Sequence, residues 1–361
     1  MKNVLITGGA GFIGANFVQY LLGKHKDVKV IVLDALTYAG NLNNLAEFRV
    51  EPRFTFIKGN ICDQFLVEEA LTGNNVDTIV HFAAESHVDR SITGPDAFIE
   101  SNIVGTHSLL KAARNVWEKA GGFEGKLFHH VSTDEVYGSL GPDDPAFSES
   151  TPYAPNSPYA ASKASSDHLV RAYHHTFGLP VTTSNCSNNY GPYQFPEKLL
   201  PLCLLNILEG KPLPVYGDGL QIRDWLYVDD HSRGIELVMQ NGTHGETYNI
   251  GGNNEWTNID TVKLLCEIVD QLIAEDAELQ QRFPESPASK GRLSESLITF
   301  IADRLGHDVR YAINASRIST ELGYAPEGDF KEGLALTVKW YLNNEPWWRD
   351  VMDGSYQSAQ F

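Results

Sequence analysis

A tyrosine and a lysine that could carry acid–base chemistry stand four residues apart. Tyr159 and Lys163 occur in the segment SPYAASKASSDHLV, after which apolar residues repeat with a helical period. This spacing places both side chains on one face of a helix, one turn apart. An ammonium group near a phenol lowers the pKa of the phenol, so Tyr159 becomes an acid–base candidate near neutral pH. An exposed Tyr–Lys pair without a chemical role is the alternative.

Three polar residues follow an apolar run in HHVSTDEVYG, namely Thr133, Asp134 and Glu135. Thr133 can hydrogen-bond a substrate hydroxyl beside the tyrosine. Two adjacent carboxyl groups exceed what oxidation of an alcohol needs, and one can stay protonated as an acid while the other acts as a base. A helix N-cap or a loop pair of acids is the alternative. The position at the end of a buried strand favours a catalytic role for both acids.

The segment ITGGAGFIG predicts a dinucleotide site. Gly8, Gly11 and Gly14 follow a strand candidate and lead into a helix, where glycine lets the backbone approach a pyrophosphate and the helix N-terminus attracts it. Asp34 ends the next strand, where a carboxylate can hydrogen-bond the adenosine ribose and repel a 2′-phosphate. The predicted cofactor is therefore NAD rather than NADP.

Further cofactor residues are predicted at the ends of the following strands. Asn60 and Ile61 come where an adenine ring would lie, although a plain turn is an equally good interpretation. Ala83 and Ala84 are small enough for close passage of a cofactor, and His87 beside them is either a ligand-side donor or a structural histidine. The predicted cofactor site comprises Gly8, Gly11, Phe12, Ile13, Gly14, Asp34, Thr37, Asn60, Ile61, Ala83, Ala84, Tyr159 and Lys163.

The elements that position these residues read as an α/β fold. Apolar, β-branched runs alternate with helix-compatible stretches, which indicates a Rossmann-type, doubly wound parallel sheet with its ligands beyond the carboxyl ends of the strands. Pro and Gly cluster after about residue 188 and predict a smaller C-terminal substrate-binding lobe. The polar residues 274–300 predict a surface insertion with some helix. The strand candidates cover residues 3–9, 28–36, 54–60, 76–84 and 125–138.

We accordingly expect two regions. Residues 1–187 would mainly form the NAD-binding Rossmann domain with the catalytic residues. Residues 188–361 would mainly bind substrate, with some segments returning to the first domain.

Composition limits the possible partners. The chain has 361 residues and a formal net charge of −18, which argues against binding to nucleic acid or to anionic membranes. Hydrophobic residues make up 42% of it, enough for a sizeable core, yet no apolar run approaches the roughly 20 residues of a membrane span. The four cysteines are far apart and show no metal-ligand spacing. We expect no metal, reduced thiols and a cytoplasmic location.

The chain resembles the extended short-chain dehydrogenase/reductase family and, within it, the branch that dehydrates nucleotide hexoses. The resemblance covers nearly the whole chain and is carried by TGGAGFIG, AAESHVDRSI, STDEVYG, YAASKASSDHLV, NCSNNYGPYQFPEKLLP, QIRDWLYVDDH, YNIGG and DRLGHDVRYAI. Relatives that epimerise or decarboxylate nucleotide sugars typically lack the aspartate of STDE. Asp134 therefore favours dehydration.

The resemblance implies dTDP-glucose as the substrate and an internal redox cycle. Tyr159 would take the proton of the 4-hydroxyl while NAD accepts the hydride of carbon 4. Lys163 would hold the nicotinamide ribose, and Thr133 would orient the 4-oxygen. Glu135 would remove the carbon 5 proton, Asp134 would protonate the departing 6-hydroxyl, and the hydride would return to carbon 6.

The resemblance also implies a nucleotide-sugar site. Arg223 would pair with the diphosphate, a task that suits the planar guanidinium. Asparagine at position 60 departs from the usual aspartate, and Leu305 departs from the usual proline. The implied substrate contacts are His87, Thr133, Asn188, Glu197, Lys198, Leu199, Pro214, Tyr216, Arg223, Asn258, Arg304 and His307.

Members of this family pair through two long helices, which implies a homodimer. The expected contacts are residues 97–117, with Ile99, Ile103, Leu110, Val116 and Trp117, and the helix that carries Tyr159. Three alternatives stay open for function. These are dehydration of another nucleotide hexose such as UDP-glucose, a nucleotide-sugar epimerase or decarboxylase, and a noncatalytic NAD-binding protein on the same fold.

Overall fold

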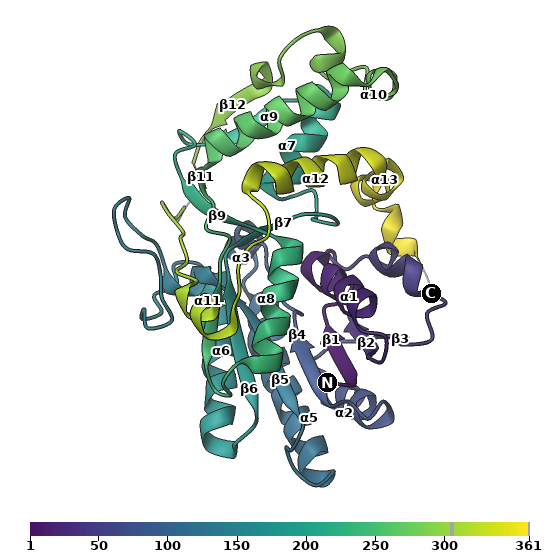
Figure 1. The fold of residues 1–361 in the computed structure, drawn as a ribbon, viewed down its shortest axis with the longest axis vertical. Coiled ribbons are helices and arrows are strands. Elements are labelled where there is room, and N and C mark those ends of the chain that lie inside the picture. The colour runs from purple at the N-terminus through teal and green to yellow at the C-terminus, as the bar shows by residue number, and fades with distance from the viewer. Residues whose placement is uncertain (304–306, 360–361) are drawn as a thin grey trace.

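The computed structural model describes residues 1–303 and 307–359. Within them, a seven-stranded parallel sheet forms the centre of the larger lobe, in the order β10-β6-β5-β4-β1-β2-β3 (Figure 1). The order reverses between β1 and β4, where ligands of such sheets bind. The predicted α/β class and all five predicted strands are confirmed. The strands are β1 (Asn3–Thr7), β2 (Lys29–Asp34), β3 (Phe54–Lys58), β4 (Thr78–His81), β5 (Leu127–Thr133), β6 (Val181–Cys186) and β10 (Thr247–Ile250).

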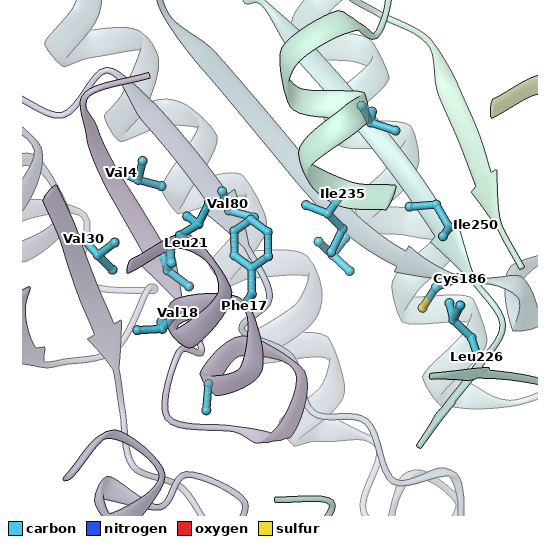
Figure 2. Packing of buried hydrophobic residues seen from close by; sticks show 14 of the residues in the cluster. Val4, Phe17, Val18, Leu21, Val30, Val80, Cys186, Leu226, Ile235 and Ile250 are labelled. Carbon is cyan, nitrogen blue, oxygen red and sulfur yellow. The ribbon is translucent and has the colours of Figure 1, made fainter. Parts of the chain in front are cut away.

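Helices cover both faces of this sheet, which explains the continuous apolar runs of its strands. Successive side chains of a strand point to opposite faces. Val4 and Ile6 of β1 pack with α1 (Phe12–Lys24) and α8 (Val228–Asn241), whose buried residues include Phe17 and Ile235, as Figure 2 shows for part of this cluster. Leu5 faces the other side. The helices there are α2 (Gln64–Gly73), α5 (Thr106–Lys119) and α6 (Pro158–Phe177).

The predicted helical segment over residues 97–117 is present but is not one regular α-helix. It begins with a single turn, continues as a π-helix and becomes α-helical at Thr106. None of the described helices is both long and apolar enough to cross a membrane. The short elements of the larger lobe are η1 (Leu42–Phe48), α3 (Val88–Thr93), α4 (Asp96–Phe98), η2 (Ile99–Gly105), η3 (Asp134–Tyr137) and α11 (Ser316–Leu322).

A smaller lobe packs around a second hydrophobic cluster, in the upper half of Figure 1. Its two small sheets have the orders β11-β9-β7 and β12-β8. The strands are β7 (Asn188–Tyr190), β8 (Leu213–Tyr216), β9 (Ile222–Tyr227), β11 (Glu255–Thr257) and β12 (Ile298–Ile301). The helices are α7 (Leu199–Leu208), α9 (Asn258–Glu275), α10 (Ala277–Arg282), η4 (Ala288–Lys290), η5 (Ser294–Leu297), α12 (Phe330–Asn343), α13 (Glu345–Asp353) and η6 (Ser355–Ser358).

The polar stretch 274–300 contains helix, as predicted, but it is more than a surface insertion. Phe283 is only 3% exposed and belongs to the core of the smaller lobe, and Ser286 and Ser294 are fully buried. Strand β12, which begins within this stretch, pairs in parallel with β8. The stretch therefore helps to build the lobe, although its sparse apolar residues give little periodic signal.

Candidate active site

A cavity of about 520 Å³ brings the predicted residues together. It is lined by the ends of the parallel strands and by residues of the smaller lobe. Arg304 lies outside the described residues. All other predicted site residues line this cavity: Gly8, Gly11, Phe12, Ile13, Gly14, Asp34, Thr37, Asn60, Ile61, Ala83, Ala84, His87, Thr133, Asp134, Glu135, Tyr159, Lys163, Asn188, Glu197, Lys198, Leu199, Pro214, Tyr216, Arg223, Asn258 and His307.

The glycine loop after β1 forms a cradle that fits a dinucleotide. Gly8 has φ +71°, and a Cβ on Gly14 would lie 2.3 Å from the Gly8 oxygen, so both positions exclude a side chain. A Cβ on Gly11 would approach only that same oxygen, at 3.4 Å, and nothing else within 4 Å. Gly11 also starts α1 without a side-chain cap. Open space beside uncapped N–H groups at a helix N-terminus suits a pyrophosphate.

Asp34 has a role that sequence reasoning missed. Its Oδ2 accepts a hydrogen bond from the Ala10 N–H at 2.9 Å, and its Oδ1 accepts one from the Leu36 N–H at 2.8 Å. The carboxylate therefore fixes both the glycine loop and the loop after β2 while it lines the cavity. Burial raises the pKa of Asp34, and the two backbone bonds act in the opposite direction.

Replacement of Asp34 by Ser should weaken NAD binding about tenfold and relax the rejection of NADP, because the charge and a hydrogen bond are both lost. Titration of the purified protein with each cofactor, followed by calorimetry, measures this. Asp77 is a matched control, since its carboxylate also accepts two backbone N–H groups, from Lys2 and Asn3, but does not line the cavity. An Asp34→Ser variant that keeps the wild-type preference for NAD would disprove the assigned role.

Asn60, one of the residues predicted near the adenine ring, forms a turn. Asn60 Oδ1 accepts from the Cys62 N–H at 2.9 Å, so the turn interpretation applies even though Asn60 lines the cavity. A Cβ on Gly8 would lie 2.7 Å from Ala83 Cα, which shows how closely the loops after β1 and β4 approach. His87 has the structural role, because it caps α3; it also lines the cavity, so its role as a donor to a ligand stays a prediction.

The predicted catalytic pair, Tyr159 and Lys163, lies on the inner face of α6. Ser157 caps this helix by accepting from the Ala160 N–H, and Pro158 occupies its first turn, a favourable helix start. Tyr159 and Lys163 are 8% and 4% exposed. Lys163 Nζ donates to the Val131 carbonyl at 2.9 Å, which ties the helix to β5. The N-terminal turns of α6 thus hold Tyr159 and Lys163 against β5, the strand that Asp134 and Glu135 follow.

The expected effect of Lys163 on the pKa of Tyr159 is not seen. Burial raises the pKa of Tyr159 well above its usual value, and the nearby Glu135 carboxylate raises it further. A hydrogen bond with Thr133 acts in the opposite direction. Burial also lowers the pKa of Lys163, whose ammonium is directed to a backbone carbonyl. The i, i+4 spacing predicts that the two side chains share a helix face, but it does not predict which neighbouring charges determine the pKa of Tyr159.

Asp134 is the more deeply buried of the two acids. Asp134 is 2% exposed, and within the described residues its Oδ2 has no hydrogen-bond partner. Burial raises the pKa of Asp134 well above its usual value, and the charges of Glu135 and Asp224 add to this effect. A carboxyl group in such a site stays protonated and can serve as an acid. The prediction that one member of the pair is neutral therefore has a physical basis in Asp134.

The smaller lobe supplies the other wall. Asn188 Oδ1 is buried without a partner among the described residues and is thus suited to a ligand. Arg223 is 6% exposed, donates to the Ile222 and Asp308 carbonyls, and lies 4.5 Å above the Tyr311 ring. These contacts fix a guanidinium at the cavity wall, as recognition of phosphate requires.

At the far end, an aromatic edge and a histidine line the cavity. The rings of Tyr216 and His307 are 6.0 Å apart in a T-shaped arrangement, and His307 Nδ1 lies 2.6 Å from Asp303 Oδ1. Sequence reasoning missed several further lining residues, because their partners are distant in the chain. They include Tyr38, Glu85, Ser86, Cys186, Gln194, Phe195 and Trp225.

Comparison with known proteins places this site in a family. Residues 5–337 match the family model described as GDP-mannose 4,6 dehydratase. The dTDP-glucose 4,6-dehydratase of Neisseria meningitidis serogroup B is 53% identical over 359 residues, which cover 99% of this chain and 98% of the relative.

Solved structures agree. DesIV, a dTDP-glucose 4,6-dehydratase from Streptomyces venezuelae solved with NAD bound, has a TM-score of 0.85 and 48% identity, covering 97% of this chain and 99% of the other. A UDP-glucose 4-epimerase from Thermotoga maritima has a TM-score of 0.79 and 27% identity, and the match covers 95% of this chain and 99% of the epimerase. The epimerase shares the fold, whereas about half of all residues are shared with the dehydratases. On this identity over nearly its full length, the chain belongs to the dTDP-glucose 4,6-dehydratase family.

Proposed function

We propose that the protein is an NAD-dependent hydro-lyase that converts dTDP-glucose to dTDP-4-keto-6-deoxyglucose and water. The observation that carries this proposal is the joint presence of a Tyr–Lys pair, a buried aspartic acid whose pKa is raised by its surroundings, and an adjacent glutamate on one cavity with a dinucleotide cradle. The family names of the close relatives support it. Bound NAD would accept hydride from carbon 4 of the sugar and return hydride to carbon 6.

In this proposal, each proton transfer is carried out by a different side chain. Tyr159 would take the proton of the 4-hydroxyl as a phenolate, which requires that the positive charges of Lys163 and of bound NAD offset the effect of burial on its pKa. Glu135 removes the proton of carbon 5, which the 4-ketone has acidified, and gives it back to carbon 5 at the end. Asp134 donates its proton to the 6-hydroxyl, which leaves as water. At the end of the cycle Tyr159 has gained one proton and Asp134 has lost one. Transfer of one proton from Tyr159 to Asp134, directly or through solvent, restores the starting protonation states.

Binding and orientation fall to the remaining residues. The glycine loop would hold the pyrophosphate, Asp34 the adenosine ribose, and Lys163 the nicotinamide ribose. Arg223, Asn188, Glu197 and Lys198 would hold the nucleotide sugar from the other side. The larger lobe would thus serve the cofactor, and the smaller lobe would serve the substrate. In this division residues 188–361 mainly form the substrate lobe, with α8 and β10 returning to the main sheet.

Mass spectrometry of dTDP-glucose incubated with the purified protein, without added NAD, tests the function. A product lighter by about 18 mass units is expected, since internal return of hydride needs no external cofactor. A parallel incubation with UDP-glucose determines the base preference. An unchanged substrate mass with NAD supplied would overturn the proposal.

A homodimer is the proposed assembly, with a revised interface. Leu110 and Trp117 are buried in the core of their own subunit, so the expectation that they form the interface is wrong. Ile99 and Val104, 47% and 42% exposed, lie on the same helical segment and remain available. Closed twofold dimers are the commonest oligomers. Sedimentation at twice the 40.0 kDa chain mass would support this, and sedimentation as a monomer would refute it.

A cytoplasmic location is also proposed. The four cysteines form no disulfide, and three of them are buried. Unpaired thiols are typical of reducing compartments. Cell fractionation would test the location.

A further inference from the structure

A tyrosine bridges the two lobes at the wall of the cavity. Tyr38 lies in the loop after β2, and its hydroxyl donates to Glu197 Oε1 of the smaller lobe at 3.0 Å. The Arg90 guanidinium stands 3.7 Å from the centre of the Tyr38 ring and 3.6 Å from Glu197. Tyr38 and Glu197 both line the cavity. We call these three residues the Tyr38 bridge.

The loop that carries Tyr38 is held in a strained conformation. Leu36 has φ +53°, unusual for a side chain of this kind, and its N–H is held by Asp34. A Cβ on Gly40 would lie 2.9 Å from Asp34 Oδ1, so the loop closes tightly around the carboxylate. Strain of this kind persists where surrounding contacts fix it, and it is frequent at ligand clamps.

The end of the chain fixes the same loop from outside. Tyr356 of η6 donates to the Tyr38 carbonyl, and Trp347 of α13 donates to Asn44 in the following 3₁₀-helix. Phe195, next to the bridge in the smaller lobe, packs edge-on against the rings of Tyr38 and Tyr356. In Figure 1 the yellow C-terminal segment accordingly reaches back to the dark N-terminal elements. Contacts from three distant segments thus converge on Tyr38.

We infer that Tyr38 is a cofactor-retaining residue, whose hydroxyl bond to Glu197 ties the cofactor loop to the substrate lobe so that NAD leaves only when the bridge opens. The inference rests on the proposed function, in which the same NAD molecule must give back its hydride. Because Glu197 stands in the proposed substrate segment, a closed substrate lobe would also keep the cofactor in place.

Exchange of bound NAD tests this. Holoprotein is mixed with excess deuterated NAD, and native mass spectrometry follows replacement of the bound cofactor. Tyr38→Phe, which loses one hydrogen bond to a carboxylate, should exchange NAD about tenfold faster than wild type. Tyr248→Phe is a matched control, because the Tyr248 hydroxyl also donates to a carboxylate at 3.0 Å, that of Glu321, and Tyr248 does not line the cavity.

A second arm tests the coupling between the lobes. Thymidine diphosphate should slow NAD exchange in wild type and slow it much less in Tyr38→Phe, an effect that a loss of fold stability alone would not give. Equal exchange rates for Tyr38→Phe and Tyr248→Phe would overturn the inference.

Glu197→Leu removes the acceptor of the Tyr38 hydroxyl bond, and it replaces Tyr38→Phe if that variant melts early. Faster exchange is again expected, and a wild-type rate would overturn the inference. No hexose substrate is present in these assays, so failure of the proposed function would show separately, as absence of product when wild type is given dTDP-glucose.

Discussion

Tyr159→Phe should reduce turnover about 10³-fold, since loss of a positioned acid–base group typically costs 10² to 10⁴ in rate. The first oxidation cannot proceed without a group that takes the 4-hydroxyl proton. Tyr159 is buried next to Thr133, and Lys163 on the same helix is directed to a backbone carbonyl. The block should therefore precede every later step. Rapid mixing with dTDP-glucose should show no reduction of bound NAD by absorbance at about 340 nm.

Tyr173→Phe is the matched control for this prediction. Tyr173 lies on the same helix, is 9% exposed and does not line the cavity. Its variant should keep wild-type turnover. Reduction of bound NAD at the wild-type rate in Tyr159→Phe would assign the first proton transfer to another group.

Strands that carry apolar runs were predictable, and strands with polar residues were not. The run VTTSNC of β6 contains four polar residues and lacks the signal of a buried strand, yet all of it is buried. The structure explains this through His129, whose ring nitrogens lie 2.9 Å from Thr182 Oγ1 and 3.0 Å from Ser184 Oγ. A buried polar group is tolerated when it is hydrogen-bonded. That pairing joins residues more than 50 positions apart, so no local pattern reveals it.

The residues that line the site could be predicted from the sequence, whereas the contacts among them could not. Parallel strands deliver their carboxyl ends to one edge, so residues after each apolar run had to converge. Which of them contact one another depends on packing across the lobes. The bond between Tyr38 and Glu197 spans 159 positions, and the bond of Lys163 to Val131 spans 32. Burial, which sets the pKa of Tyr159 and Asp134, is likewise a property of the folded lobe.

Asp134→Asn should slow loss of water about 10²-fold and leave the first oxidation intact. An asparagine keeps the shape of the neutral acid but cannot give up a proton to the 6-hydroxyl. The 4-keto intermediate should therefore accumulate with reduced cofactor. In heavy water, its carbon 5 proton should still exchange with solvent, because Glu135 is unchanged. Glu135→Gln should give the opposite result, an intermediate whose carbon 5 proton is retained.

The stability of Asp134→Asn should separate its chemistry from its packing. The folded pKa of Asp134 is raised by burial, so its neutral form contributes stability that is complete below the unfolded pKa and is lost as the pH rises through the folded pKa. Asparagine cannot ionise, so the variant should escape that loss and unfold at a higher temperature than wild type in alkaline buffer. Thermal unfolding across pH measures this. A variant that is slow in water loss yet no less stable than wild type is what an acid catalyst predicts. Wild-type turnover would instead remove Asp134 from the mechanism, because an amide cannot replace an acid that must release its proton.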